Sequence, residues 1–185
     1  MKKNYIFLAP GFEELEALTV VDVMRRAGLN IVIVSIEDTP YVTGAHNVTF
    51  QADALYTDIN FNDADWLILP GGMPGATNLH EFDPLNNLLC THFADGGNIA
   101  AICASPAVVL APLGLLKGRE ATCYPGFEKK CESAGARMHN DLVVTDGNLV
   151  TGQGPAAAMP FALDIVKLVC GEAKSKEVGV GMLFY

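Results

Sequence analysis

The stretch NIAAICASP, residues 98–106, decides the expected fold. It starts as a short apolar run typical of a buried strand, and Cys103 follows that run directly, between small residues. A helix is expected next, over residues 105–113. A strand, a sharp turn and a helix in this order are typical of a nucleophile elbow, in which the nucleophile projects from the turn. A buried, inert core cysteine would fit the same residues, and the local sequence alone favours that alternative.

Apolar strands and amphipathic helices alternate along the rest of the chain. This alternation predicts an α/β fold in which helices cover both faces of a mostly parallel sheet. No linker or repeat interrupts it, so we expect one domain over residues 1–185. The expected strands are 4–9, 30–36, 65–69, 98–102 and two within 141–151, with a hairpin over 41–51. The expected helices are 13–27, 84–94, 105–113, 127–134, 156–170 and 173–183.

Ligands bind at the carboxyl ends of the strands in such sheets, so the loops there are the candidate sites. One of them, LPGGMPG at residues 69–75, places glycines directly after an expected strand. Their free backbone N–H groups could form an oxyanion site. A plain glycine turn explains this loop equally well. The loop contains neither of the common glycine-rich phosphate-binding patterns, so we expect no phosphate site.

Three acids, Glu13, Glu14 and Glu16, fall in the first turn of the helix expected over 13–27. Acids are favoured there by the helix dipole alone. Glu13 and Glu16 each begin an apolar stripe, whereas Glu14 is the one we expect to be solvated. A carboxyl group on an inward stripe is desolvated and keeps its proton, so it could donate a hydrogen bond to a thiolate. The spacing does not choose between Glu13 and Glu16.

The composition narrows the class of protein. The chain has 185 residues, 50% of them hydrophobic and 18% charged, and its net charge is -9. Nucleic acids and anionic membrane surfaces repel such a charge, so we expect neither as a partner. No apolar stretch reaches the roughly 20 residues of a membrane span, and the N-terminus lacks the pattern of a secretory signal. We therefore expect a cytoplasmic protein.

The cysteines and histidines form no metal-binding pattern. The five cysteines include no CxxC pair, and the four histidines include neither HxH nor HExxH. We therefore expect no metal, no disulfide framework and reduced thiols. Cys103 should have a lowered pKa at the start of a helix. Its rivals as the reactive thiol are Cys131, which follows two lysines, and Cys123.

Five segments in order resemble the ThiJ/PfpI superfamily, and more closely the subgroup of the Parkinsonism-associated protein deglycase and its small bacterial relatives. The resemblance implies a flavodoxin-like three-layer α/β sandwich that works as a homodimer. It places Asp22 and Arg26 on the helix used for dimer contact. The segments are LAPGFEELEA, VDVMRRAG, LPGGMPGA, AAICASP and TGQGPAAAMPFALDIV.

The same resemblance implies roles for single residues. Cys103 matches the nucleophilic, oxidation-sensitive cysteine, and Glu16 matches the protonated glutamate. Tyr124 stands where many relatives carry a histidine, so we expect no Cys–His dyad and no protease activity. The remaining matches are Gly72 and Ala104, whose N–H groups face the cysteine, Gly154 and Pro155 in a pocket loop, and His46 near the site.

The resemblance implies a cofactor-free, cysteine-dependent stress enzyme. Its substrate would be a small reactive aldehyde such as methylglyoxal, or a glycated amine or thiol, as in glyoxalases and protein deglycases. Two alternatives remain open. One is a redox sensor or chaperone without turnover, and the other is a role in thiazole monophosphate biosynthesis.

Overall fold

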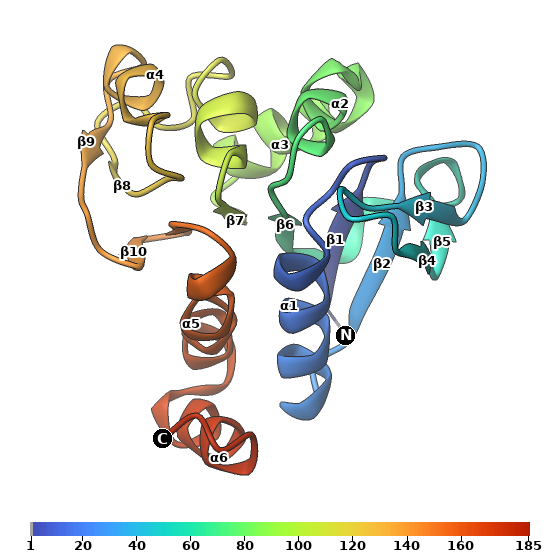
Figure 1. Ribbon diagram of the computed structural model, residues 1–185, viewed down its shortest axis with the longest axis vertical. Helices are drawn as coiled ribbons and strands as arrows, with labels where there is room; N and C mark the ends of the chain where they lie inside the picture. Colours follow the sequence, from blue (N-terminus) through green and yellow to red (C-terminus); the bar gives the residue numbers. More distant parts are fainter. Residues whose placement is uncertain (1) are drawn as a thin grey trace.

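The computed structural model describes residues 2–185 and is built around a seven-stranded sheet (Figure 1). The strand order is β10-β11-β7-β6-β1-β2-β5, and every neighbouring pair is parallel except β10 and β11. The strands are β1 (Lys3–Leu8), β2 (Ile31–Ser35), β5 (Ala54–Leu55), β6 (Ala64–Leu69), β7 (Asn98–Ile102), β10 (Val143–Asp146) and β11 (Leu149–Gly152).

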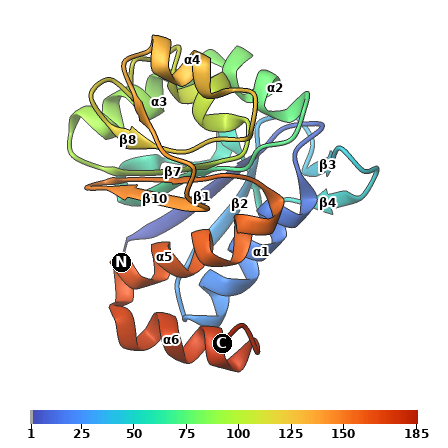
Figure 2. The same ribbon diagram turned by 60° about the vertical axis from the view of Figure 1, so that its left-hand side comes forward.

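Helices cover both faces of this sheet, as Figure 2 shows. On one face lie α1 (Glu14–Arg26) and α5 (Ala158–Cys170), with α6 (Glu172–Gly181) packed on α5. On the other lie α2 (Gly75–Glu81), α3 (Asp83–Ala94) and α4 (Glu128–Ser133), together with a short π-helical turn (Pro106–Leu110). The predicted three-layer sandwich is confirmed. None of the described helices is long and apolar enough to cross a membrane.

Buried hydrophobic side chains form two clusters, one on each face of the sheet. This division follows from strand periodicity. In β1, Ile6 and Leu8 point to the cluster under α1 and α5, whereas Tyr5 and Phe7 point to the cluster under α2 and α3. Successive side chains of a strand point to opposite faces, so a central parallel strand must be apolar throughout. Burying each of these large side chains stabilises the fold by roughly 1.5–3 kcal/mol.

The strand order brings the expected site loops to one edge. From β1 the chain adds β2 and β5 on one side, then crosses to add β6, β7 and β11 on the other. The reversal lies between β1 and β6, and ligands bind at such a switch point. The carboxyl ends of β1, β6 and β7 therefore place residues 9–13, 70–74 and 103–106 side by side.

Two small sheets complete the structure. The predicted hairpin consists of β3 (Tyr41–Thr43) and β4 (Thr49–Gln51), and its turn contacts the start of α1. The parallel pair β8 (Glu120–Ala121) and β9 (Arg137–Met138) has no sequence prediction.

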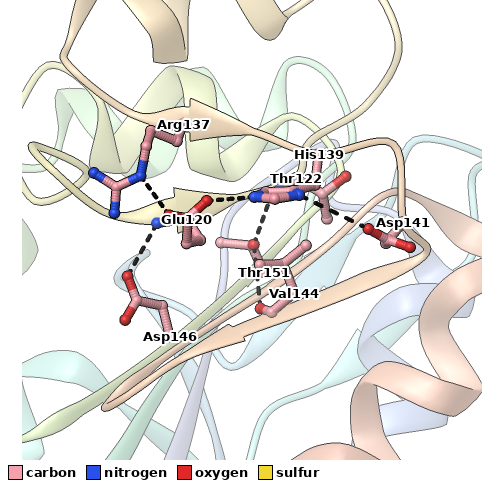
Figure 3. Close-up of polar contacts among 8 residues, drawn as sticks. All are labelled: Glu120, Thr122, Arg137, His139, Asp141, Val144, Asp146 and Thr151. Carbon is pink, nitrogen blue, oxygen red and sulfur yellow. Dashed lines mark hydrogen bonds and ion pairs between the residues drawn. The ribbon is translucent and has the colours of Figure 1, made fainter.

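Hydrogen bonds attach β8 to the edge of the large sheet (Figure 3). The amide of Glu120 donates to Asp146 Oδ2 at 3.0 Å, and the amide of Thr122 donates to Thr151 Oγ1 at 2.9 Å. The Glu120 carboxylate also binds Arg137 and His139 of the β9 segment. These contacts fix the chain that continues into residues 123–127, beside the loop after β7.

The helix expected over residues 105–113 differs from the structure. Only Pro106–Leu110 forms a helical turn, of the wide π type, in which the amide of Ala111 donates to Pro106 O at 2.9 Å. Such turns recur at functional sites, because they displace the backbone locally.

Candidate active site

Cys103 occupies a constrained turn directly after β7. Its φ is 66°, in the left-handed region that residues other than glycine seldom adopt. The Cys103 amide donates to Gly152 O at 2.9 Å, and its carbonyl accepts from the amide of Tyr124 at 2.8 Å. Contacts from both sides thus hold the strained conformation. The predicted nucleophile elbow is confirmed in its backbone geometry.

Two backbone amides face the sulfur of this elbow. The N–H groups of Gly72 and Ala104 both donate to Cys103 Sγ. Gly72 has a φ of 87°, and a Cβ at this position would lie 2.4 Å from the amide nitrogen of Glu13. Only glycine fits there. The structure therefore brings together the two donors that the sequence singled out.

The carboxyl group of Glu16 lies against the same sulfur. Glu16 is fully buried, its Oε2 accepts from the amide of Gly71 at 2.7 Å, and its side chain forms a hydrogen bond with Cys103. Its Oε1 is buried without a partner among the described residues. An ionised oxygen is costly in that position, so the environment favours the neutral acid. Of the two acids on apolar stripes, Glu16 is the one beside the thiol.

Gly71 lies against both the Glu16 carboxyl group and the Cys103 thiol. It was not among the predicted site residues. A Cβ on Gly71 would lie 2.5 Å from Cys103 Cβ and 2.8 Å from Glu16 Oε2. The acid and the thiol can meet only because this position has no side chain. The signal in the sequence was the glycine pair that follows β6 after Pro70.

Burial raises the pKa of Glu16 to about 7, although the Gly71 amide and the thiol oppose the shift. Burial and the Glu16 carboxylate also raise the pKa of Cys103 to about 12, against the lowering effect of Gly72 and Ala104. The prediction that Cys103 has a lowered pKa is therefore wrong. The two groups interact strongly and titrate as a pair, in apparent steps of about 7 and about 12. Between these steps the pair holds one proton and one negative charge.

A pocket of about 470 Å³ opens above Cys103. Among the expected pocket residues, His46, Tyr124 and Pro155 line it. Gly154 lines an adjacent hollow of about 160 Å³ instead, behind the ring of Tyr124. The remaining lining residues are Glu13, Leu15, Gly72, Met73, Ala104 and Phe127. Leu15, Met73 and Phe127 were missed, although Leu15 and Met73 lie within the segments LAPGFEELEA and LPGGMPGA.

The expectation that Glu14 is solvated is wrong. The hairpin turn covers this side chain, which is only 8% exposed. Its Oε1 accepts from the amide of His46 at 2.8 Å, and its Oε2 lies 3.0 Å from His46 Nδ1. Burial raises the pKa of Glu14, but these hydrogen bonds outweigh it and lower the pKa overall. The same pairing raises the pKa of His46, with a further contribution from Glu13.

Glu13, Glu14 and His46 are the described residues that could together ligate a metal ion, since their donor atoms lie within 4.8 Å of one another. Both carboxylates already accept hydrogen bonds from backbone or imidazole N–H groups. The cluster therefore needs no ion to satisfy it. That the protein uses no metal and no cofactor stays a prediction.

The fold and the elbow together define a class of α/β proteins that hold a cysteine nucleophile at the carboxyl edge of a parallel sheet. Within this class, the chain belongs to the DJ-1/PfpI family, whose profile matches residues 2–168.

Curated relatives and solved structures agree with this assignment. The chain is 34% identical over 178 residues to the glutathione-independent glyoxalase DJR-1.2 of Caenorhabditis elegans, covering 96% of this chain and 94% of that protein. It is 36% identical to Arabidopsis thaliana DJ-1 homologs B and A, but it spans only 40% and 45% of their lengths. The structure of oxidized Toxoplasma gondii DJ-1 superposes with a TM-score of 0.94 at 36% identity, covering 99% of this chain and 98% of that one.

Proposed function

We propose that the protein is a cysteine-dependent enzyme of reactive carbonyls, of the glyoxalase or protein deglycase type. The observation that carries the proposal is that Cys103 and the two amides of Gly72 and Ala104 lie at the floor of one pocket, with the buried carboxyl group of Glu16 against the sulfur. A nucleophile, a proton donor and two oxyanion donors are the groups that addition to an aldehyde requires. The relative from Caenorhabditis elegans is named a glyoxalase, which supports the same class.

Methylglyoxal illustrates the proposed reaction. The Cys103 thiolate attacks the aldehyde carbon, and the resulting oxyanion takes a proton, so that a hemithioacetal forms. Gly72 and Ala104 donate hydrogen bonds to the developing oxyanion. The Glu16 carboxylate then moves a proton from the former aldehyde carbon to the ketone carbon, while the hydroxyl proton passes to the ketone oxygen, which gives a lactoyl thioester. Water hydrolyses the thioester, so that the products are lactate and free Cys103.

The pocket fits a small substrate. Its volume of about 470 Å³ lies in the usual range for ligand sites, and apolar side chains such as Leu15 and Phe127 form much of its wall. A small aldehyde can reach the sulfur, and so can the end of a glycated side chain. Tyr124 supplies no useful base at neutral pH, so peptide hydrolysis is not part of the proposal.

Turnover by the pure protein tests this function. We expect purified protein to convert methylglyoxal to lactate without glutathione, and Cys103→Ser to abolish the conversion. A redox sensor is the second candidate, because the donors around Cys103 would also hold an oxidised sulfur, and one structural relative is described as oxidized. Absence of turnover in a folded, reduced sample would reject the enzyme and leave the sensor.

We also infer a homodimer formed through α1. Leu15 and Leu18 are 63% and 50% exposed on this helix. Asp22 and Arg26 follow them and pair with each other at 2.9 Å. A second copy would cover the exposed leucines, and two-fold dimers are the commonest oligomers. Sedimentation at micromolar concentration should give a dimer for the wild type and a larger monomer fraction for Leu18→Lys. A monomeric wild type would contradict the inference.

We also propose that the chain forms one domain and that the protein is cytoplasmic. The strands that carry the site all belong to the large sheet. The cysteines of the described chain are unpaired, as thiols are in a reducing compartment.

A further inference from the structure

Glu13 is an acidic residue in the wall of the pocket above Cys103. It precedes α1 as its N-cap, it is only 8% exposed, and it lines the pocket of about 470 Å³ together with the thiol. The proposed reaction gives this carboxylate no role, because the acid against the sulfur is Glu16. A polar group that lines a pocket without taking part in the chemistry is a candidate for substrate recognition.

The backbone fixes Glu13 beside the loop after β6. The amide of Glu13 donates to Gly71 O at 2.9 Å, and its carbonyl accepts from the amide of Ala17 at 3.1 Å. A Cβ on Gly72 would lie 2.4 Å from the Glu13 amide nitrogen, so these two residues are in direct contact. The amide of Gly72 also donates to Cys103 Sγ. One short loop therefore contacts both Glu13 and the thiol, and it fixes their relative position.

The Glu13 carboxylate is only weakly paired. Its Oε1 accepts from the amide of Leu15 at 3.4 Å, which is long for a hydrogen bond. Its Oε2 lies 3.5 Å from His46 Nδ1, which is closer to Glu14 Oε2, at 3.0 Å. An ionised carboxylate can accept about four hydrogen bonds. Within the described chain Glu13 accepts one long bond, so it keeps the capacity to bind a donor from a ligand.

The charges at this end of the pocket sum to a negative value. Glu13 and His46 are the charged residues that line it, and the described lysines and arginines lie elsewhere. Glu14, which pairs with His46, adds a second carboxylate. A protonated His46 offsets only one of the two carboxylates, so one negative charge remains. Lys130 lies 5.6 Å from the centre of the Phe127 ring, but it lines a neighbouring groove instead of this pocket.

Two neighbouring groups respond to the charge of Glu13. Burial raises the pKa of Glu16, and Glu13 raises it further. The hydrogen bond to Glu14 raises the pKa of His46, and Glu13 adds to this shift as well. His46 has a side chain that is 69% exposed, whereas Glu16 is fully buried against the thiol. The negative potential of Glu13 therefore extends from the exposed edge of the pocket to its floor.

We propose that Glu13 is a specificity-determining residue, through which the pocket selects neutral and positively charged carbonyl compounds over those with a carboxylate or phosphate group. The inference rests on the proposed function for the identity of the reacting group. An aldehyde adduct of an amine or guanidine carries positive charge close to the reacting carbon, and Glu13 Oε2 can accept its N–H groups. A carboxylate in the same place is repelled.

Thiol reagents that differ in charge test the proposal without any turnover. The probes are the methyl, 2-(trimethylammonium)ethyl and 2-sulfonatoethyl methanethiosulfonates, which are neutral, positive and negative. Each forms a mixed disulfide with Cys103, and peptide mass spectrometry follows this residue alone. The neutral reagent corrects for changes in the thiolate fraction. We expect the positive reagent to react faster than the negative one, and Glu13→Gln to lower this rate ratio about tenfold at low salt.

Matched controls separate the charge of Glu13 from its role as the cap of α1. Gln keeps an oxygen for the Leu15 amide, and Glu13→Asp keeps the charge, so Glu13→Asp should retain most of the rate ratio. Glu37→Gln removes an exposed acid outside the pocket and should change nothing. Cys170, which is exposed at the end of α5, gives a reference ratio in each sample.

Two results would overturn the proposal. One is a wild-type rate ratio in Glu13→Gln, and the other is an equal loss in Glu13→Gln and Glu13→Asp, which would assign the effect to the cap. Conversion of methylglyoxal is measured on the same samples. Selection by charge in a protein without turnover would support Glu13 and reject the proposed enzyme. Turnover without selection by charge would reject the inference about Glu13 alone.

Discussion

Glu16 and Cys103 lie so close on one side of Gly71 that a methyl group on this glycine would come within 2.8 Å of Glu16 Oε2 and 2.9 Å of Cys103 Sγ. The acid and the thiol meet across a position that no side chain can occupy. Because they share one proton between their two ionisation steps, each group sets the charge of the other.

Gly71→Ala should abolish carbonyl turnover. The added Cβ would lie 2.5 Å from Cys103 Cβ, so the elbow and the acid must move apart. Overpacking of this kind costs typically 1–3 kcal/mol of stability, which the fold should survive. The matched control is Gly181→Ala, at a position in α6 where a Cβ meets nothing within 4 Å. Circular dichroism and lactate formation, measured on both variants, check the prediction. Full activity in Gly71→Ala would show that the thiol and the acid need not touch.

Glu16→Gln should separate thiolate formation from turnover. Burial and the Glu16 carboxylate raise the pKa of Cys103, against the amides of Gly72 and Ala104, which lower it. Removing the Glu16 charge should lower the pKa of Cys103, so alkylation of Cys103 by iodoacetamide at pH 8 should be faster in Glu16→Gln than in the wild type. Gln keeps a donor beside the sulfur but cannot move a proton. Alkylation should persist, while lactate formation should fall by about 100-fold or more.

The opposite outcome has a clear signature. If Cys103 of Glu16→Gln is alkylated no faster than that of the wild type, then the charge of Glu16 does not raise the pKa of the thiol. Peptide mass spectrometry of Cys103 distinguishes its alkylation from that of the other cysteines. Glu16→Asp is the reach control, because its shorter side chain keeps the charge but moves it away from the thiol.

The stability of the protein should fall as pH rises through neutrality. The folded pKa of Glu16 is raised from its ordinary 4.5 to about 7, so the folded state binds the extra proton in this window. The stabilisation is complete below pH 4.5 and is lost as pH rises through about 7. The difference amounts to roughly 3 kcal/mol in the free energy of unfolding. Urea unfolding of wild type and Glu16→Gln at pH 5 and pH 8 measures it. Parallel pH curves for the two proteins would contradict the prediction.

The sequence predicted the elements whose stability is local. The strand expected at 98–102 matches β7 at both ends, because polar or small residues bound its apolar run. Helix α2 was missed, since it begins at Gly75 without a capping side chain and continues from a glycine-rich loop. Strands β8 and β9 have two residues each and depend on distant partners such as Asp146 and Thr151. No local pattern encodes such contacts.

In the candidate site, too, the features that depend on local sequence were predicted, and those that depend on distant contacts were not. The position of Cys103 followed from the strand and turn around it, and the resemblance selected Glu16 where the apolar stripes left two choices. The burial of Glu14 could not be predicted, because it depends on His46 and Val48, which lie more than 30 residues away in the hairpin turn. The raised pKa of Cys103 was missed for a related reason. It depends on the burial of the thiol in the folded protein and on the charge of Glu16, which lies in another element.

Cys103 should be the first cysteine to gain oxygen under dilute peroxide, and it should stop at the sulfinic acid. The amides of Gly72 and Ala104 donate to the sulfur, and these two donors, with the protonated form of Glu16 beside them, would stabilise the sulfinate oxygens. Cys170 is the internal control, because it is exposed and ends α5 without such donors.

Mass spectrometry of peptides over a peroxide time course measures the order of oxidation. Cys103 should carry two oxygens before Cys170 carries one, because the stabilising donors outweigh simple exposure at this site. In Glu16→Asp the shorter acid reaches the oxidised sulfur less well, so a larger fraction should proceed to the sulfonic acid. If Cys170 gains oxygen while Cys103 remains a thiol, then Cys103 is an inert core cysteine, and the proposed active site is wrong.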